Sequence, residues 1–399
     1  MLLNVLDYGC LLENALSAAR AGDKIYLPAR QPYVAPAGGW MIDKSLEIYG
    51  DGPGTRTVAG TVLVAAPGAD PPTDVLTLAP PESAGYRLYN CYLHDLRIVG
   101  SATAETVGGR YGITFNPDYQ DDRIMTHVRL ERIAIERLGA HGINLRGKVP
   151  APPAKPSSVD GLWIRDCHVE RCGDHGIKLE NAYVVGLIGV RCVGNAKEGL
   201  EATLGGGIAL YGCVFDGNQQ ASGSADLVIG PVARAPRIDA CVFRNFYRGN
   251  VANVACLLNG TEGGCVSGSS FEMPSTHAGG VGLRITDADS STGAITILPN
   301  RFVNVQTAIE VIEKPTPDGA APGCFIAAQA CDPSSIALPH KPNDAPVAIL
   351  GGGLLMPSYT ADPPWLPHDG MLSHLSTADP LNQQLRAYVA GQWQRVDLL

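Results

Sequence analysis

The sequence is poor in aromatic and charged residues. Phe, Trp and Tyr make up 6% of the 399 residues, and Asp, Glu, Lys and Arg together make up 17%. An ordinary helical domain carries more charge, because the solvated faces of its helices need it. The core must therefore be built from Val, Ile, Leu, Ala and Cys, while 47 glycines and 30 prolines indicate many turns. This composition favours a β-rich chain of short strands.

Further absences exclude several classes of function. The sequence has no run rich in Lys and Arg and a net charge of −9, so we expect no nucleic-acid partner. No apolar run approaches the ~18 residues of a membrane-spanning helix, so we expect no membrane insertion. The start lacks a basic segment and meets a carboxylate at Asp7, which predicts no secretory signal. The eleven cysteines form no CxxC motif, and we predict no metal site, no disulfides and no cofactor.

A five-residue signature with alternating apolar positions recurs along the chain. Its copies are Tyr111-Gly-Ile-Thr-Phe, His141-Gly-Ile-Asn-Leu, His175-Gly-Ile-Lys-Leu, Glu198-Gly-Leu-Glu-Ala and Ala225-Asp-Leu-Val-Ile. A second signature, centred on a cysteine, lies between successive copies of the first. Two interleaved strand patterns at unequal steps predict a coil whose strands keep their length while its turns absorb insertions. Such coils bury a continuous core only when they are stacked.

Alternation along each strand predicts which side chains face the core. In the first signature, Ile113, Ile143 and Ile177 should point inward and their neighbours should point to solvent. In the second signature, we expect the cysteines to stack as one inward, apolar column. The members of that column are Cys167, Cys192, Cys213 and Cys241.

The His-Gly-Ile-x-Leu and Ile-x-x-Cys-x-Val repeats resemble those of the pectate-lyase-like superfamily. The start, Asn4-Val-Leu-Asp7-Tyr-Gly before a helix-like Leu11–Arg20, resembles the N-terminal portion found there and in phage tailspikes. The resemblance implies an all-β, right-handed, single-stranded parallel β-helix, with a capping helix over the open end of the stack and an irregular C-terminal tail. We predict the cap over residues 1–22, the β-helix over residues 23–335 and a C-terminal strap or hairpin over residues 336–399.

The catalytic patterns of that superfamily are not reproduced. Polygalacturonase-like members carry several aspartates on adjacent rungs, whereas Gly173-Asp174-His175-Gly176 supplies one carboxylate and a histidine. Tyr92-Leu-His94-Asp95 is a poor match to the Trp-x-Asp-His segment of pectate lyases. The chemistry must therefore be sought in the residues themselves.

Aligned copies of the first signature place polar side chains on one outward face. One column runs Thr114, Asn144, Lys178, Glu201, and the other runs Asn116, Arg146, Glu180, Thr203. Glu180 and Glu201 would lie one rung and two residues apart, a diagonal of roughly 7–8 Å that suits an inverting glycoside hydrolase. Asp174 is a third catalytic candidate. A polysaccharide lyase would instead use Lys178 or Arg146 as the base.

The remaining residues of this face are candidates for substrate binding. Tyr119 belongs to an insertion beside the face and could stack on a sugar ring. The other candidates are Asn144, Arg146, Lys178, His141, His175 and Glu198. Ion pairs between Lys178 and Glu201 and between Arg146 and Glu180 would equally stabilise the sheet without any catalytic role.

The sequence thus leaves two main functions open. One is a carbohydrate-active protein, leaning to a glycoside hydrolase or polysaccharide lyase, that binds and cleaves a surface or extracellular polysaccharide. The other is a non-catalytic virion spike or fibre for host-glycan adhesion, and a purely architectural part is a third interpretation. The resemblance to tailspikes implies a virion or extracellular particle, and a homotrimer or assembly with a larger particle. A cytoplasmic location is the alternative.

Overall fold

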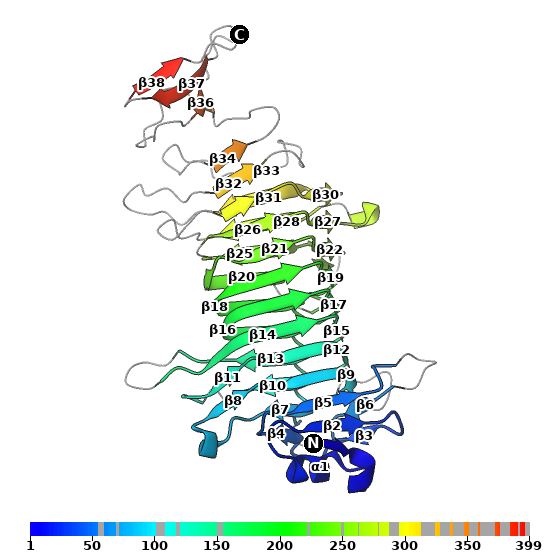
Figure 1. Cartoon of the computed structure of the whole chain (residues 1–399). Coiled ribbons are helices and arrows are strands. Elements are labelled where there is room, and N and C mark those ends of the chain that lie inside the picture. The colour runs from blue at the N-terminus through cyan, green and yellow to red at the C-terminus, as the bar shows by residue number, and fades with distance from the viewer. Residues whose placement is uncertain are drawn as a thin grey trace.

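The computed structural model is a right-handed parallel β-helix (Figure 1). It describes residues 1–54, 60–68, 72–100, 108–116, 120–149, 155–221, 224–248, 251–261, 263–277, 279–286 and 295–312, and then the backbone of strands β32–β38. The coil strands pair in parallel with the equivalent strands of the next coil, in a single sheet of 32 strands that winds around the core. We call three sides of this sheet the first, second and third faces.

The first face carries the first signature and turns into the second face at a corner. It contains β4 (Trp40–Ile42), β7 (Leu76–Leu78), β10 (Ile113–Phe115), β13 (Ile143–Arg146), the starts of β16 (Ile177–Ile188), β18 (Leu200–Tyr211) and β20 (Ala225–Arg234), then β25 (Val254–Asn259), β28 (Val281–Thr286) and β31 (Thr307–Ile312). The corner contains β8 (Arg87–Tyr89), β11 (Ile124–Thr126), the start of β14 (Ser158–Arg165) and the middle of β16 and β18.

The second and third faces complete each coil. The second contains β1 (Leu2–Asn4), β2 (Lys24–Leu27), β5 (Glu47–Gly50), the starts of β9 (Tyr92–Val99) and β12 (Arg129–Glu136), the ends of β14, β16 and β18, then β21 (Arg237–Asp239), β26 (Gly264–Ser267) and β29 (Ile295–Ile297). The third contains β3 (Tyr33–Val34), β6 (Val62–Val64), the ends of β9 and β12, then β15 (His168–Glu170), β17 (Arg191–Val193), β19 (Val214–Asp216), β22 (Val242–Arg244), β27 (Ser270–Glu272) and β30 (Arg301–Val303).

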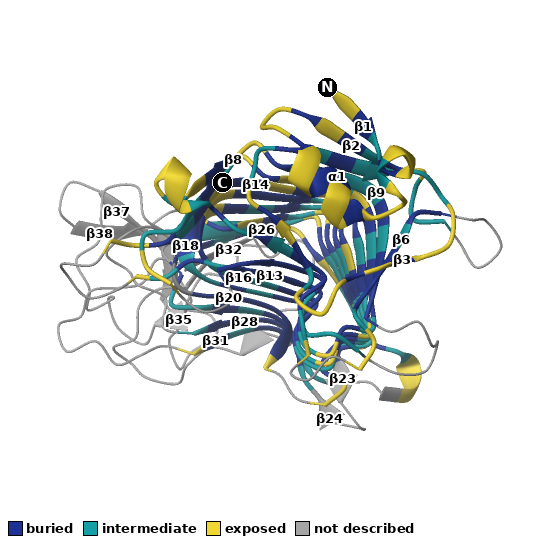
Figure 2. Cartoon of the chain, turned by 90° about the horizontal axis from the view of Figure 1, so that it is seen from below, coloured by how far each residue is buried: buried dark blue, intermediate teal, exposed yellow. Residues whose placement is uncertain are grey.

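A short helix covers the N-terminal end of the stack. Seen from that end in Figure 2, α1 (Leu12–Ala18) lies across the coil opening, after the 3₁₀ turn Val5–Tyr8. Leu12, Ala15 and Leu16 are buried, and the indole N–H of Trp40 donates to Glu13 at 3.0 Å. None of the helices in the described part of the chain is long and apolar enough to cross a membrane.

The C-terminal strands begin as part of the stack and end as a separate sheet. β33 (Ile336–Ala337) pairs in parallel with β31, β32 (Cys324–Ala327) pairs with β29, and β34 (Val347–Leu350) pairs with β32. β35 (Ser358–Tyr359), β36 (Leu372–Leu375), β37 (Gln384–Val389) and β38 (Gln392–Arg395) form a four-stranded sheet of their own. β37 and β38 pair in the antiparallel direction.

The predicted cysteine column is wrong at one position. The backbone N–H of Arg191 donates to the carbonyl oxygen of Cys167, and that of Val214 donates to the carbonyl oxygen of Val190. The residue that follows Cys167 in the column is therefore Val190. Cys192 instead pairs with Val169. Two residues separate both Ile164 from Cys167 and Leu187 from Val190, and the strand register follows this spacing. Cys213 and Cys241 do lie in the column, and burial raises the pKa of the Cys167 thiol to about 12.

Candidate functional site

The register of the first face confirms the predicted pairing of neighbouring residues at the centre of both columns. Asn144 pairs with Lys178, which pairs with Glu201, while Arg146 pairs with Glu180 on the next coil. Successive rungs lie about 4.8 Å apart, so residues 23 to 34 positions apart in the sequence become neighbours. The inward residues between them, including Ile177 and Leu179, are buried and hold the strands in place.

Six charged side chains lie in the region of the His175 imidazole. We call these six residues and His175 together the His175 cluster. Its Nε2 lies 2.7 Å from Glu201 Oε2 and 3.0 Å from Glu198 Oε2. Its Nδ1 lies 2.7 Å from Asp174 Oδ1, an ion pair that lacks hydrogen-bond geometry. The cluster consists of His175, Asp174, Lys178, Lys197, Glu198, Glu201 and Arg146.

The lysines complete the charge balance of the His175 cluster. Lys178 Nζ donates to Glu201 at 2.6 Å, and Lys197 Nζ lies 2.9 Å from Asp174. Burial alone would lower the pKa of His175, but its contacts with Asp174, Glu198 and Glu201 raise that pKa to about 10. His175 is therefore an imidazolium at neutral pH, which makes it a fixed positive charge rather than a general base.

The carboxylates of the cluster are correspondingly held in the ionised form. Burial opposes ionisation of Glu201, but His175 and Lys178 lower its pKa to about 2. His175 and Lys197 outweigh burial at Asp174 and hold its pKa below the usual range. His175 and the N–H of Ser224 do the same for Glu198.

His141 differs from His175 although both begin copies of the same signature. Its Nδ1 accepts the backbone N–H of His175 at 3.3 Å, which leaves the ring proton on Nε2. Burial and the positive charge of His175 lower the pKa of His141 to about 3. Its ring stacks on Tyr111 with centroids 5.1 Å apart. His141 is thus a neutral side chain that supports the imidazolium beside it.

Glu180 lies in an environment opposite to that of Glu201. Burial and the negative charge of Glu201 raise the pKa of Glu180 to about 7. The guanidinium of Arg146, whose Nε lies 3.3 Å from Glu180 Oε2, acts in the other direction because it favours the carboxylate. The protonation of Glu180 at neutral pH therefore depends on whether Arg146 stays beside it.

The N-terminal part of the outward column is covered, which corrects one expectation. Thr114 and Asn144 are fully buried instead of facing solvent, and the Asn144 amide donates to Thr114 Oγ1 at 3.2 Å. The buried Asn144 Oδ1 has no hydrogen-bond partner among the described residues. Asn144 therefore serves as a support next to Lys178, and it is less accessible to a ligand than the sequence predicts.

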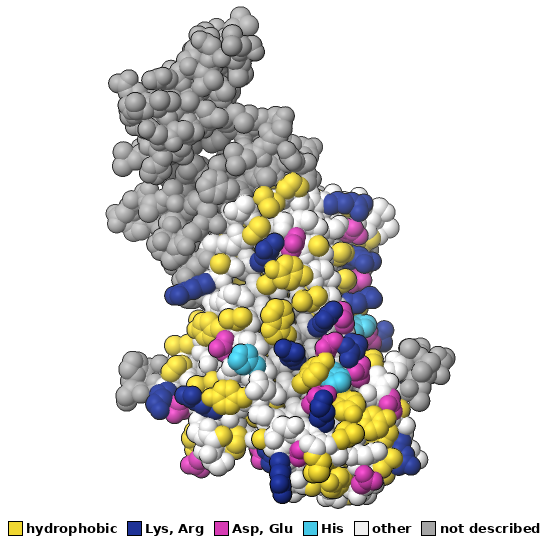
Figure 3. Space-filling model, in the orientation of Figure 1, with side chains coloured by type: hydrophobic (Ala, Val, Ile, Leu, Met, Phe, Trp, Pro, Cys, Tyr) yellow, Lys and Arg dark blue, Asp and Glu magenta, His cyan; other side chains and the backbone are white. Residues whose placement is uncertain are grey.

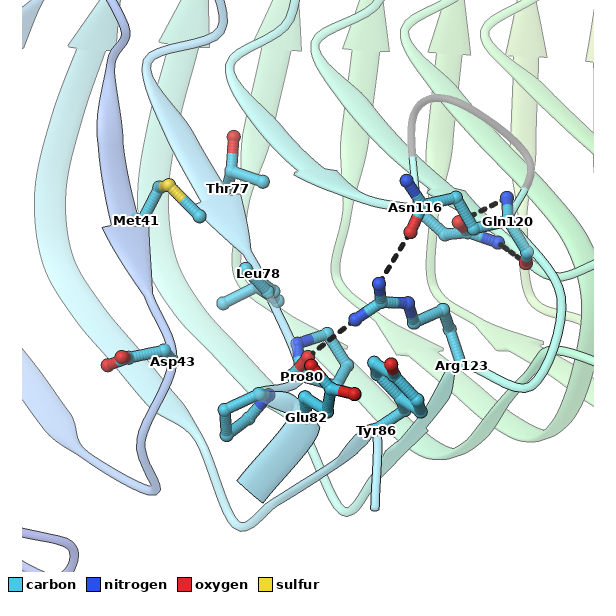
Figure 4. Close-up of a pocket in the computed structure, with 12 residues that line it drawn as sticks. Met41, Asp43, Thr77, Leu78, Pro80, Glu82, Tyr86, Asn116, Gln120 and Arg123 are labelled. Atoms are coloured by element: carbon cyan, nitrogen blue, oxygen red, sulfur yellow. Dashed lines mark hydrogen bonds between the residues drawn. The ribbon is translucent and has the colours of Figure 1, made fainter. Parts of the chain in front are cut away.

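A cleft of about 460 Å³ lies further along the same face. Thr77 in its lining is three register steps from Lys178, through Thr114 and Asn144. Figure 4 shows Arg123 reaching across this cleft, where it donates to Pro80 O at 2.8 Å and to Gln120 Oε1 at 2.6 Å. The same guanidinium lies 4.2 Å from the centre of the Tyr86 ring. The cleft and the His175 cluster thus lie along one face of the stack.

Among the residues that the structure describes, one group could hold a metal ion. Ligand atoms of His141, Asp174 and His175 lie within 4.8 Å of one another. However, His175 is protonated and faces carboxylates on both sides of its ring, so a metal would first have to displace that proton. The arrangement fits a charge network better than a metal site.

Two residues show the limits of the sequence prediction. Tyr119 lies outside the described residues. Tyr111, which is not among the predicted site residues, stacks on His141, and the Arg110 guanidinium lies 4.8 Å from its ring centre. The signal that would have included Tyr111 is its place at the first position of an aligned signature. The same position is taken by His141, His175 and Glu198 in the following copies.

With this geometry in view, the molecule is identified by its fold: a right-handed parallel β-helix of the kind found in phage tailspikes and in several β-helix enzymes. No protein-family model and no curated protein matches its sequence.

Solved structures give the comparison. The enzymatically active domain of tailspike protein 2 from bacteriophage CBA120 matches with a TM-score of 0.58 at 10% identity, covering 96% of this chain and 56% of that one. The A-module of the mannuronan C-5 epimerase AlgE4 from Azotobacter vinelandii matches at 0.50 and 16% identity, covering 81% and 93%. The DFA-IIIase of Arthrobacter chlorophenolicus matches at 0.50 and 13%, covering 79% and 87%. This chain thus spans little more than half of the tailspike domain, and at these identities the similarity shows the fold.

Proposed function

We propose that this protein binds a surface or extracellular polysaccharide along the first face and hydrolyses one of its glycosidic bonds. One observation carries the proposal: Glu180 and Glu201 lie on adjacent rungs in opposite electrostatic environments. Glycoside hydrolysis needs one carboxylic acid and one carboxylate, and an enzyme obtains them by pushing two pKa values apart.

In this mechanism Glu180 is the general acid and Glu201 is the general base. Glu180 gives its proton to the glycosidic oxygen of the leaving sugar, while Glu201 takes a proton from the water that attacks the anomeric carbon. Their diagonal of roughly 7–8 Å leaves room for that water and implies inversion. An anionic group of the substrate that draws Arg146 away from Glu180 would favour the protonated acid.

The other residues of the site hold this pair in place. Lys178 and His175 keep Glu201 ionised, and Asp174 contacts His175 and Lys197, so we assign Asp174 a positioning role. The ion pair between Lys178 and Glu201 also argues against a lyase, because Lys178 could act as a base only after leaving that carboxylate.

The similar structures support a polysaccharide as the substrate class. One of them is named as a mannuronan C-5 epimerase, and another is named as the enzymatically active domain of a phage tailspike. We extend the proposal to a role on a phage particle, with residues 336–399 as an oligomerisation element in a homotrimer. The second candidate is a non-catalytic adhesin, which is favoured by the ion pairs that Lys178 makes with Glu201 and Arg146 makes with Glu180, because such pairs stabilise a sheet without any catalytic role.

The test is incubation with polymannuronate, dextran and bacterial lipopolysaccharide, followed by assay of new reducing ends and of unsaturated uronates. We expect reducing ends without unsaturated products, and a loss of about 100-fold or more in Glu180→Gln and Glu201→Gln. The matched control is Glu310→Gln, because Glu310 continues the Glu201 column four register steps away and pairs with Arg284. Retention of a polysaccharide without products would overturn hydrolysis in favour of adhesion, and unsaturated products would indicate a lyase.

A further inference from the structure

A second candidate site for a sugar lies around the corner from the first face. Trp163 is an outward residue of β14 and is 45% exposed, an unusual position for the largest side chain. In the parallel ladder it lies between Arg129 on the preceding coil and Gly186 on the next. It belongs to the same coil as Arg146 but lies on the second face.

Gly186 provides the surface on which the indole rests. A Cβ atom at Gly186 would lie 2.5 Å from both Cε3 and Cζ3 of Trp163, so the six-membered ring of the indole lies against the glycine backbone. Any other residue there would push the ring away. One side of the indole is thus held by the neighbouring rung, while nearly half of the side chain stays exposed.

A second glycine opens a hollow beside the indole. The corner positions Asn90, His127 and Gly161 all have left-handed backbones, with φ of 53°, 55° and 65°. A Cβ at Gly161 would lie 2.9 Å from the His127 ring, so a side chain would fill the space that this glycine leaves. The resulting cleft of about 420 Å³ is lined by these three residues together with Trp163, Arg129, Tyr92 and Cys91.

Three polar side chains of this cleft have unused hydrogen-bonding capacity. Asn90, His127 and Arg129 are exposed, and their side chains make no hydrogen bond or ion pair to any residue that the structure describes. Tyr92, in contrast, donates its hydroxyl to Glu131 at 2.6 Å. A held aromatic ring surrounded by free donors and acceptors is the arrangement that binds a sugar, whose ring has an apolar face and polar edges.

We propose that Trp163, Arg129, His127 and Asn90 form a second glycan-binding site, separate from the groove on the first face. A sugar residue of a polysaccharide lies with its apolar face on the Trp163 indole, and its hydroxyl or carboxylate oxygens accept hydrogen bonds from Arg129 and His127. Tyr89 and Tyr183, in one column of the same corner with Thr126 and Asp160 between them, are 38% and 42% exposed and offer further aromatic contacts along the stack. Because adjacent rungs are about 4.8 Å apart, an elongated chain can follow these side chains.

The surroundings favour a glycan over a protein partner. Two residues after Arg129 and Trp163 along their strands, the outward positions of the second face are charged. They are Glu131 and Arg165, which are neighbours in the ladder. A stable protein interface buries about 800 Å² on each partner around an apolar centre. On the face shown in Figure 3, hydrophobic side chains are scattered among Lys, Arg, Asp and Glu instead of forming one patch.

The test is electrophoresis of Glu180→Gln protein, in which the proposed hydrolysis is slowed, through gels containing polymannuronate, dextran or lipopolysaccharide. We expect at least one polysaccharide to retard it, and Trp163→Ala in the same background to weaken that retardation about tenfold. Gly186→Ala keeps the indole but displaces it, so it should weaken retardation as well. Ile312→Ala, which removes an equally exposed apolar side chain from β31, is the matched control and should have no effect.

Three results would overturn this second site. They are equal retardation with and without Trp163, no retardation in any gel, and a change in sedimentation coefficient in Trp163→Ala, which would assign the surface to a protein contact. Failure of the hydrolase proposal is distinguishable, because it shows as an absence of products from the wild-type protein while Trp163-dependent retardation persists.

Discussion

The inside and the outside of the coil stack use the stacking of residues in opposite ways. Inside, Phe215, Phe243, Phe271 and Phe302 form a stack with centroids 5.2, 4.9 and 4.8 Å apart. Outside, the His175 cluster stacks residues of unlike charge. Rung spacing of about 4.8 Å brings either kind of neighbour into contact. Repetition of one side chain stabilises an apolar column, whereas a charged column requires alternating signs.

The comparison predicts the largest loss of stability in the aromatic stack. Phe243→Ala removes a fully buried ring between two others and should lower the free energy of unfolding by about 3–5 kcal/mol. Urea denaturation monitored by circular dichroism measures it. A loss below about 1 kcal/mol would contradict the central place given to this stack.

The second largest loss, on the order of 3 kcal/mol in the free energy of unfolding, is expected in the His175 cluster. His175→Gln removes the cation between Glu198 and Glu201, and breaking a buried ion pair leaves charge uncompensated. The same denaturation experiment at pH 7 measures the loss. Lys197→Gln, at the more exposed edge of the cluster, is the control and should cost clearly less. Equal costs would show that His175 is not the centre.

The stability contributed by the His175 cluster should depend on pH, whereas that of the aromatic stack should not. Because the folded pKa of His175 is raised to about 10, its stabilising contribution is full below about pH 6.5 and is lost as the pH rises through 10. Glu201, with a folded pKa of about 2, contributes above about pH 4.5 and loses its contribution as the pH falls through 2. Melting temperatures between pH 7 and 10.5 should therefore fall more in wild type than in His175→Gln. Parallel curves would refute the assignment.

A smaller effect is expected in the buried asparagine pair at a turn of the coil. Asn218 Oδ1 accepts from the side chain of Asn195 at 2.8 Å, and Asn218 Nδ2 donates to Cys192 O at 3.0 Å. Asn218→Ala leaves these buried partners unsatisfied and should cost about 1–3 kcal/mol. Chemical denaturation measures this change. Asn14→Ala, at an exposed site, is the control, and equal losses would contradict a special role of the buried pair.

The smallest change should come from an outward pair far from the His175 cluster. Arg284 Nε donates to Glu310 at 2.5 Å, but both side chains are partly exposed. Arg284→Gln should lower stability by no more than about 1 kcal/mol, because solvent screens such pairs. A loss as large as that of His175→Gln would mean that partial burial does not distinguish the two columns.

The sequence predicted which residues of the candidate site are neighbours, because its periodicity reports the register. Aligning Gly142, Gly176 and Gly199 was enough to place Lys178 beside Glu201 and Arg146 beside Glu180. The same method failed at Cys192, because cysteine and valine fill an inward position equally well and the pattern could not tell which one occupied it. It also did not predict a site at Trp163, because the contact of the indole with Gly186 joins residues of different coils that share no motif.

What the sequence determined by itself is the coil: alternating apolar residues at recurring steps bury a core only when strands stack in parallel. Only the tertiary structure decided the chemistry of individual groups. His141 and His175 begin copies of the same signature, yet the pKa of His141 is lowered to about 3 and that of His175 is raised to about 10. The reason is physical, since a pKa depends on burial and on charges a few ångströms away, and those neighbours come from other coils.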